Sequence, residues 1–171
     1  AGSGLATLSL PGSMGVPDEA VKNTLIAEYN NIDSVTQHLE AHNDIAAVII
    51  EPIAGNMGVV EPTQEFLQQL RTITRDKGIL LIMDEVMSGF GRTGKWFGVD
   101  NHGVIPDMIA TAKGITSGYI PLGALIVSYK IAAHYDDKVL WLGLTYSAHP
   151  VSLAASLEVL KIYEDENMLE N

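Results

Sequence analysis

Three short apolar runs, each closed by a charged residue, constrain the fold of this sequence more than any other feature. The runs are residues 45–50, 79–83 and 108–112, and the residues that close them are Glu51, Asp84 and Lys113. Apolar runs of this length without polar alternation are typical of strands that are buried on both faces, as in parallel sheets. The first two runs are therefore predicted to be buried strands of a largely parallel sheet, and the third is a further strand candidate.

Helical patterns separate these strands. Between Thr63 and Gly78, apolar residues recur at helical spacing, with threonine in the N-cap position and glycine as the stop. A shorter helix is predicted over residues 33–42, with Asp33 as its N-cap. The chain then predicts a fourth strand over residues 122–127 and a helix over residues 151–163. A strand, a helix and a second strand form a right-handed parallel unit, so the expected class is α/β, with a mostly parallel sheet and flanking helices.

The first 17 residues have a different character. They contain six glycine and proline breakers, which forbid a long regular element. We expect a lid-like loop over residues 1–17, followed by a single domain over residues 18–171. The chain opens on Ala1 without a methionine and closes on a polar stretch, which predicts a fragment of a longer protein.

The charge balance restricts the partners. Lys and Arg number 10 against 21 Asp and Glu, and the net charge of −11 disfavours a nucleic-acid partner. No apolar run reaches the roughly 20 residues that span a bilayer, so no membrane partner is expected. The lack of cysteine excludes disulfides and Cys-ligated zinc, which favours a cytoplasmic location, and no metal site is predicted.

The polar residues that close the strands are the first candidates for chemistry, because ligands of open α/β sheets gather at the carboxyl ends of strands. A carboxylate such as Asp84 needs a positive partner there, which a protonated pyridine nitrogen would provide. A lysine such as Lys113 can form a Schiff base when it is neutral. On spacing alone, Asp84 could equally be a cap or salt-bridge partner, and Lys113 is more readily interpreted as a solvated lysine.

A competing pattern occupies the same stretch. Residues 89–95 match G-x-x-x-x-G-K, the phosphate-binding loop of P-loop nucleotide-binding proteins, and their magnesium-binding strand also ends in acidic residues. Two details oppose this interpretation. Trp96 stands where the loop carries Ser or Thr, and the loop follows the acidic strand instead of preceding a helix. A P-loop module is the alternative from another functional class.

Four motifs occur in order: D-E-V-M-S-G-F-G-R-T-G at 84–94, P-D at 106–107, A-K-G at 112–114 and P-L-G-A at 121–124. This series resembles the central signature of class III aminotransferases, which are fold type I pyridoxal-phosphate enzymes. The resemblance continues upstream through 51–58 and downstream through 143–150. It implies that the chain is part of the cofactor-binding large domain, with the N-terminal segment and the small C-terminal domain outside it.

The resemblance implies roles for four residues. Asp84 would pair with the pyridinium nitrogen of pyridoxal 5'-phosphate, and Val86 would pack on one face of the ring. Lys113 would hold the cofactor as a Schiff base and, once displaced by substrate, would act as the base that moves the proton. Thr145 matches a threonine that binds the cofactor phosphate from the neighbouring subunit, which implies a homodimer with composite sites.

Other polar and glycine positions are expected to shape the backbone rather than to do chemistry. They are His102, His149 and the glycines of residues 89–94. Two departures from the family limit the mechanism. Met87 replaces a glutamine that contacts the phenolic oxygen of the cofactor, and Asn56 replaces a glutamate that pairs with a switching arginine in gamma-aminobutyrate-type members. Neither interaction is expected here.

The two halves resemble different members of the family. Residues 1–8, 15–17, 22–24 and 54–58 are similar to glutamate-1-semialdehyde aminomutase, in which the first stretch is a lid. Residues 91–97 and 144–147 look like omega-amino-acid and taurine:pyruvate aminotransferases instead. Amino-group transfer between an amine or amino acid and a keto acid is the expected function. The alternatives are the aminomutase and an inactive structural remnant, and this chain alone is expected neither to bind the cofactor tightly nor to catalyse.

Overall fold

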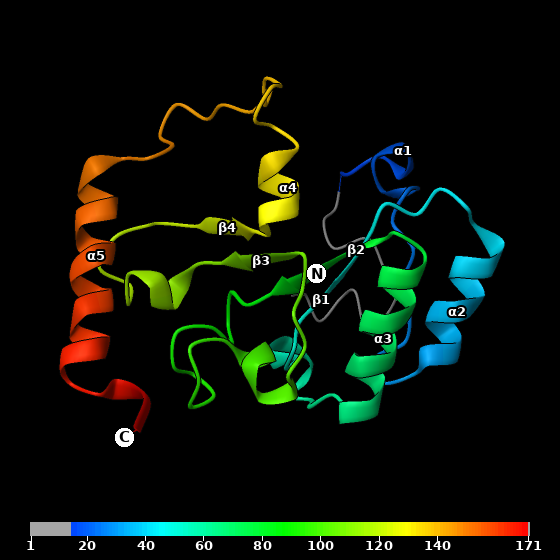
Figure 1. Cartoon of the computed structure of the whole chain (residues 1–171), viewed down its shortest axis with the longest axis horizontal. Coiled ribbons are helices and arrows are strands. Elements are labelled where there is room, and N and C mark those ends of the chain that lie inside the picture. The colour runs from blue at the N-terminus through cyan, green and yellow to red at the C-terminus, as the bar shows by residue number, and fades with distance from the viewer. Residues whose placement is uncertain (1–14, 171) are drawn as a thin grey trace.

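The computed structural model describes residues 15–170, which form a four-stranded sheet with flanking helices (Figure 1). The sheet has the order β1 (Ala47–Ile50), β2 (Leu80–Asp84), β3 (Met108–Thr111) and β4 (Ala124–Val127). β1, β2 and β3 are parallel, and β4 is antiparallel to β3. The predicted α/β class and mostly parallel sheet are confirmed, and each of the four predicted strands forms.

Helix α3 (Gln64–Asp76) connects β1 to β2. The Thr63 hydroxyl accepts a hydrogen bond from the Phe66 N–H at 3.2 Å, which satisfies one of the free N–H groups of the first turn. Gly78 takes a φ of +70° just after the helix, a conformation that glycine adopts without strain. The predicted start and stop of this helix are therefore confirmed.

Helix α2 (Ile32–Ala41) packs on the outer side of α3. The helix is confirmed, but the prediction that Asp33 is its N-cap is wrong. Asn31 has an extended backbone and its Oδ1 accepts a hydrogen bond from the Ser34 N–H at 3.2 Å. Asp33 lies inside the first turn, where its negative charge faces the positive end of the helix dipole.

Three further α-helices complete the described part: α1 (Asp18–Val21), α4 (Tyr129–Ala133) and α5 (Pro150–Asp165). Figure 1 shows α5 standing apart from α2 and α3, at the opposite side of the view beyond the ends of β3 and β4. Short 3₁₀ turns lie at Gly55–Met57, Gly98–His102, Lys113–Ile115 and Met168–Glu170. Most of the expected lid lies outside the described residues. Within those residues, no helix is long and apolar enough to cross a membrane.

The two faces of the sheet differ in burial. One face packs against α3 in the main core, which contains Val35, Leu39, Phe66, Leu67, Leu70, Leu81 and Met83. The other face is here called the open face. A row of residues that are paired in register across the four strands lies on it: Ile49, Ile82, Met108 and Val127. On it, Ile49 is 51% exposed and Leu125 is 57% exposed. The expectation that the strands are buried on both faces is therefore wrong for β1, because residues 15–170 cover only one face.

Candidate functional site

Asp84 and Lys113 lie at the same edge of the sheet, at the ends of neighbouring parallel strands. Asp84 is the last residue of β2 and pairs with Ala110 of β3. The Glu85 N–H donates a hydrogen bond to the Ala110 carbonyl at 2.8 Å, which ties the two strand ends together. Lys113 follows Ala110 by three residues. The structure thus brings the predicted carboxylate and the predicted amine to one edge, where ligands of such sheets bind.

The Asp84 carboxylate is half-buried and accepts a single hydrogen bond from the described residues. Its Oδ1 accepts a hydrogen bond from the Val86 N–H at 3.1 Å. Among the described residues it has no ion-pair partner and no other hydrogen bond. Val86 is also half-buried, directly beyond the strand. This carboxylate can therefore accept a further hydrogen bond from a cationic group.

Lys113 begins a 3₁₀ turn and its side chain is exposed. Its φ of +42° lies in the left-handed region, which non-glycine residues seldom adopt. The backbone of this turn packs closely against Phe90, since a Cβ added at Gly114 would lie 2.7 Å from the Phe90 Cβ. Within residues 15–170, the Lys113 Nζ has neither a hydrogen bond nor an ion pair. The backbone is constrained while the amine is accessible.

Glu85 is a residue of this edge to which the sequence assigned no role. It is fully buried, and its carboxylate accepts hydrogen bonds from the Gly98 and Val99 N–H groups, each at 2.8 Å, and from the Ser88 hydroxyl at 2.5 Å. Buried carboxylates are rare unless they are satisfied in this way. The available signal was a second acidic residue directly after Asp84. Two of its three partners, Gly98 and Val99, lie more than ten residues away, so these contacts cannot be read from spacing.

At the third predicted strand end, Glu51 is engaged in hydrogen bonds with nearby loop residues. The Glu51 Oε2 accepts a hydrogen bond from the Gly55 N–H at 3.0 Å. The Tyr29 hydroxyl donates to the Glu51 carbonyl at 3.0 Å. Burial, and then the charge of Glu51, raise the pKa of the Tyr29 hydroxyl, so it stays protonated and remains a donor. Glu51 therefore organises the loop after β1.

Within the described residues, no hydrogen bond brings Thr145 to this edge. It lies in the exposed segment between α4 and α5, in which residues 134–149 are all exposed. Figure 1 shows this segment as a long connection outside the sheet. In the described part of the chain, no hydrogen bond links Thr145 to Asp84, Val86 or Lys113. One molecule thus assembles three of the four predicted residues.

The turn formed by residues 89–95 excludes the P-loop alternative. The Phe90 N–H donates to the Trp96 carbonyl at 2.6 Å, and the Gly91 N–H donates to the Lys95 carbonyl at 3.1 Å. These N–H groups are used within the turn and cannot cradle a phosphate. No α-helix begins directly after Lys95, where the chain enters a short 3₁₀ turn and then β3, whereas a P-loop places phosphate at a helix N-terminus. Gly91 and Gly94, at φ +82° and +78°, shape the turn as expected.

The two histidines occupy structural positions. The Gln64 Nε2 donates to the His102 carbonyl at 2.7 Å, which fastens the start of α3 to the turn at Gly98–His102. His149 is the N-cap residue of α5, which Pro150 begins. Proline is well suited to the first helical position because its missing N–H costs nothing there. The geometry gives neither histidine a place at the edge of Asp84 and Lys113.

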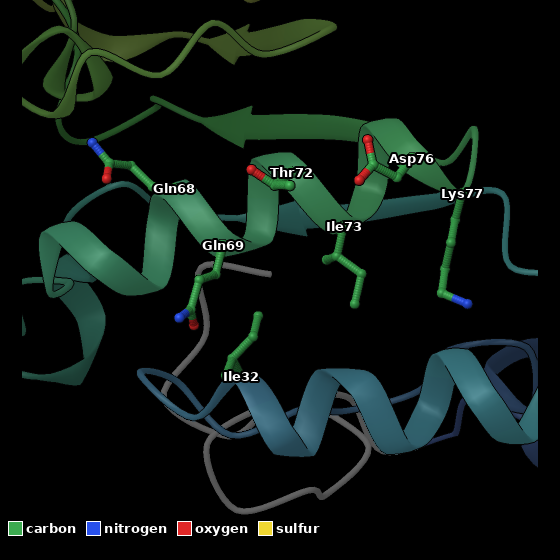
Figure 2. A pocket seen from close by; sticks show the side chains of 7 residues that line it. All are labelled: Ile32, Gln68, Gln69, Thr72, Ile73, Asp76 and Lys77. Atoms are coloured by element: carbon green, nitrogen blue, oxygen red, sulfur yellow. The ribbon is translucent and has the colours of Figure 1, made fainter.

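A groove of about 550 Å³ lies between α2 and α3, and Figure 2 shows Ile32, Gln69 and Ile73 pointing into it. Its remaining lining residues are Gln68, Thr72, Asp76 and Lys77. None of the four candidate residues lines this groove. It therefore has no part in the site at the strand ends.

Comparison with known proteins decides the family. Residues 5–171 match the family model for class III aminotransferases. The chain belongs to this family. A glutamate-1-semialdehyde 2,1-aminomutase of Persephonella marina is 43% identical to this class III aminotransferase chain over 169 residues, which cover 98% of the chain and 39% of the relative. The chain thus spans about two fifths of the length of the curated relatives it matches.

Solved structures similar to this class III aminotransferase chain are transaminases. A transaminase from the marine bacterium Virgibacillus has a TM-score of 0.79 and 41% identity, over 83% of this chain and 34% of that chain. An amine transaminase from an uncultivated Pseudomonas species, solved in its PLP-bound form, has a TM-score of 0.75 and 42% identity, over 80% and 32% of the two chains. The fold is therefore that of part of a transaminase.

Proposed function

We propose that residues 18–171 are part of the large domain of a pyridoxal-phosphate-dependent aminotransferase, and that residues 1–17 are its lid. The enzyme would move an amino group between an amine or amino acid and a keto acid. The observation that carries the proposal is the placement of Asp84 and Lys113 at neighbouring strand ends in a chain of this family.

The residues present fit this cofactor. A pyridinium N–H needs a carboxylate that can still accept a hydrogen bond, and Asp84 binds only the Val86 N–H among the described residues. The aldehyde needs an accessible amine, and the Lys113 side chain is exposed. Val86 is half-buried, so part of its side chain remains available to an aromatic ring. The donor set supports pyridoxal phosphate on chemical grounds alone.

Each residue has a distinct task in the proposed mechanism. When bound, pyridoxal phosphate supplies an electron sink for the substrate carbon. Asp84 would pair with the ring nitrogen and keep it protonated, while Val86 would pack on the ring. Lys113 would hold the cofactor through a Schiff base at Nζ. Once displaced by substrate, the Lys113 amine would act as the base that moves the proton between the substrate carbon and the cofactor.

Thr145 would serve the site of a second subunit, which makes the proposed enzyme a homodimer. Its hydroxyl would donate a hydrogen bond to the cofactor phosphate of the neighbour. The exposed apolar side chains beside it support an interface, because apolar patches on a surface mark sites of association. Trp141 is 93% exposed, and Leu142 and Leu144 are each 72% exposed. A cytoplasmic location remains a prediction that cell fractionation would check.

The test of the proposed function is Lys113→Ala in the full-length gene product. Added pyridoxal phosphate should produce the absorbance band of a Schiff base in the unaltered protein and not in the variant. Turnover should fall by at least about 10²–10⁴-fold, because the proton-transfer base is also lost. Lys95→Ala is the matched control, since Lys95 is an exposed lysine of the turn after β2. A band that persists in Lys113→Ala, or disappears in Lys95→Ala, would contradict the assignment.

The second candidate is glutamate-1-semialdehyde 2,1-aminomutase, which the names of the similar sequences favour. An aminomutase moves the amino group within one substrate, whereas a transaminase passes it to a separate acceptor. The full-length protein should be supplied with an amine and pyruvate. Stoichiometric formation of alanine supports the transaminase, and little alanine together with turnover of glutamate-1-semialdehyde supports the mutase.

A further inference from the structure

Glu85 lies between two residues of the proposed cofactor site but faces the interior. It is fully buried, whereas its neighbours Asp84 and Val86 are half-buried. Its Oε2 accepts hydrogen bonds from the Ser88 hydroxyl and the Gly98 N–H, and its Oε1 accepts one from the Val99 N–H. Because all three donors would otherwise be buried without a partner, this carboxylate holds two separate loops together.

The packing around this carboxylate leaves little freedom. A Cβ added at Gly98 would lie 2.9 Å from the Ser88 Cβ, 3.1 Å from the Glu85 Oε2 and 3.2 Å from the Pro52 Cγ. Only glycine allows the backbone of the Gly98–His102 turn to approach this closely. The close packing and the three hydrogen bonds together fix the position of the backbone that follows β2.

The same contacts extend to the lysine turn. The Glu85 N–H donates to the Ala110 carbonyl at 2.8 Å, and the Gly89 N–H donates to the Glu85 carbonyl at 3.0 Å. Gly114 lies against this loop, since a Cβ there would be 2.7 Å from the Phe90 Cβ and 3.3 Å from the Gly89 carbonyl oxygen. A shift of the loop after β2 would consequently be transmitted to the backbone next to Lys113.

We propose that Glu85 is a positioning residue of the cofactor site, an inference that rests on the proposed function. By binding Ser88, Gly98 and Val99, it fixes the chain on both sides of itself and thereby the orientation of the Asp84 carboxylate and the Val86 side chain. It touches neither the cofactor nor the substrate. Glu85→Gln preserves its size but replaces an acceptor with an NH₂ donor, which must then face the backbone N–H of Gly98 or that of Val99.

The experiment uses the full-length gene product with pyridoxal phosphate as the probe. The dissociation constant of the cofactor is measured by titrating the apoprotein, and the circular dichroism of the bound chromophore reports its orientation. Glu85→Gln should raise the dissociation constant on the order of tenfold and alter the dichroism band, because a small misplacement of a positioned group is costly. Hydrogen exchange at Gly98 and Val99 should accelerate even without the cofactor.

The matched control is Asp107→Asn, which removes a carboxylate with similar contacts at the other end of the strands. Asp107 accepts hydrogen bonds from the Leu81 N–H and from Arg71, both at 2.8 Å. This variant should lower the unfolding midpoint but leave the cofactor dissociation constant within about twofold of the wild type. Ser88→Ala removes one donor to Glu85 without introducing a repulsion. Its cofactor dissociation constant should lie between those of the wild type and Glu85→Gln.

The outcomes separate the two proposals. If Glu85→Gln is destabilised like Asp107→Asn yet keeps the wild-type dissociation constant and dichroism, Glu85 is only structural and the inference is overturned. If Glu85→Gln does not fold, the comparison of Ser88→Ala with Asp107→Asn decides by the same criterion. A wild-type protein that binds no cofactor, or a Lys113→Ala variant that keeps the Schiff-base band, overturns the proposed function and this inference together.

Discussion

Asp107 joins the amino-terminal ends of β2 and β3 through the Leu81 N–H and the Arg71 guanidinium. Burial alone would raise the pKa of this carboxyl. The hydrogen bond from Leu81, the hydrogen bond and charge of Arg71 and the charge of Lys130 outweigh burial and lower the pKa below its ordinary 3.8. The ionised form therefore stabilises the fold above the unfolded-state pKa, and this contribution is lost as the pH falls through the lower folded-state pKa.

Asp107→Asn is accordingly expected to make the free energy of unfolding less dependent on pH in the acid range. The unaltered chain should lose stability below about pH 4 in part because Asp107 becomes protonated. The variant should be less stable at neutral pH and should show a smaller further loss in that acid range. Urea unfolding at a series of pH values provides the measurement. A difference between the two proteins that is the same at pH 7 and at pH 3 would refute the linkage.

At the scale of elements, the sheet is a two-faced layer of which residues 15–170 cover one face. Leu81 lies on the covered face and is fully buried, whereas Ile49 on the open face is 51% exposed. Both side chains occur in apolar runs that look alike in the sequence. Their energetic contributions should nevertheless differ, because only Leu81 leaves a cavity when it is shortened.

Leu81→Ala should lower the free energy of unfolding of this chain by about 2–5 kcal/mol, in line with other buried leucines. Ile49→Ala should cost about 1 kcal/mol or less, since half of its side chain is already in water and no closed cavity forms. Chemical denaturation of the two variants tests the contrast. Equal costs would mean that the open face is covered in solution.

At the scale of the whole molecule, the chain forms one edge of a site rather than an enclosed pocket. Lys113 is exposed, Asp84 borders the open face, and Thr145 has no hydrogen bond to either in the described residues. Family membership is established, and the chain spans about two fifths of its curated relatives. The roles of Asp84, Val86, Lys113 and Thr145 remain predictions.

This 171-residue chain, produced alone, is therefore expected to bind pyridoxal phosphate weakly and to show no transamination above the free cofactor. A site open to solvent does not exclude water from a charged ligand, so its electrostatic contacts are weakened. Parallel titrations of the chain and of the full-length gene product with the cofactor are the measurement. A stable Schiff-base band in the isolated chain, with a micromolar dissociation constant, would refute the expectation.

Local patterns were sufficient wherever the deciding interactions lie close together in the sequence. Thr63 and Gly78 predicted α3 because capping and a left-handed stop act within one turn. The α2 cap was misplaced by two residues, since both Asn31 and Asp33 are suitable cap residues and only the backbone decides which is extended. The ordered motifs around Asp84 and Lys113 also predicted the family, which the comparisons confirm.

The mostly parallel α/β sheet, the ends of its strands and the family could all be predicted from the amino-acid sequence, because apolar periodicity, capping and ordered motifs are properties of neighbouring residues. The covered face of the sheet and the burial of Glu85 became apparent only in the folded chain. Those outcomes depend on contacts between residues far apart in the chain, such as Glu85 with Gly98 and Val99 or Gly114 with Phe90. No local pattern encodes such contacts, since they exist only after the strands have paired and the loops have closed over their ends.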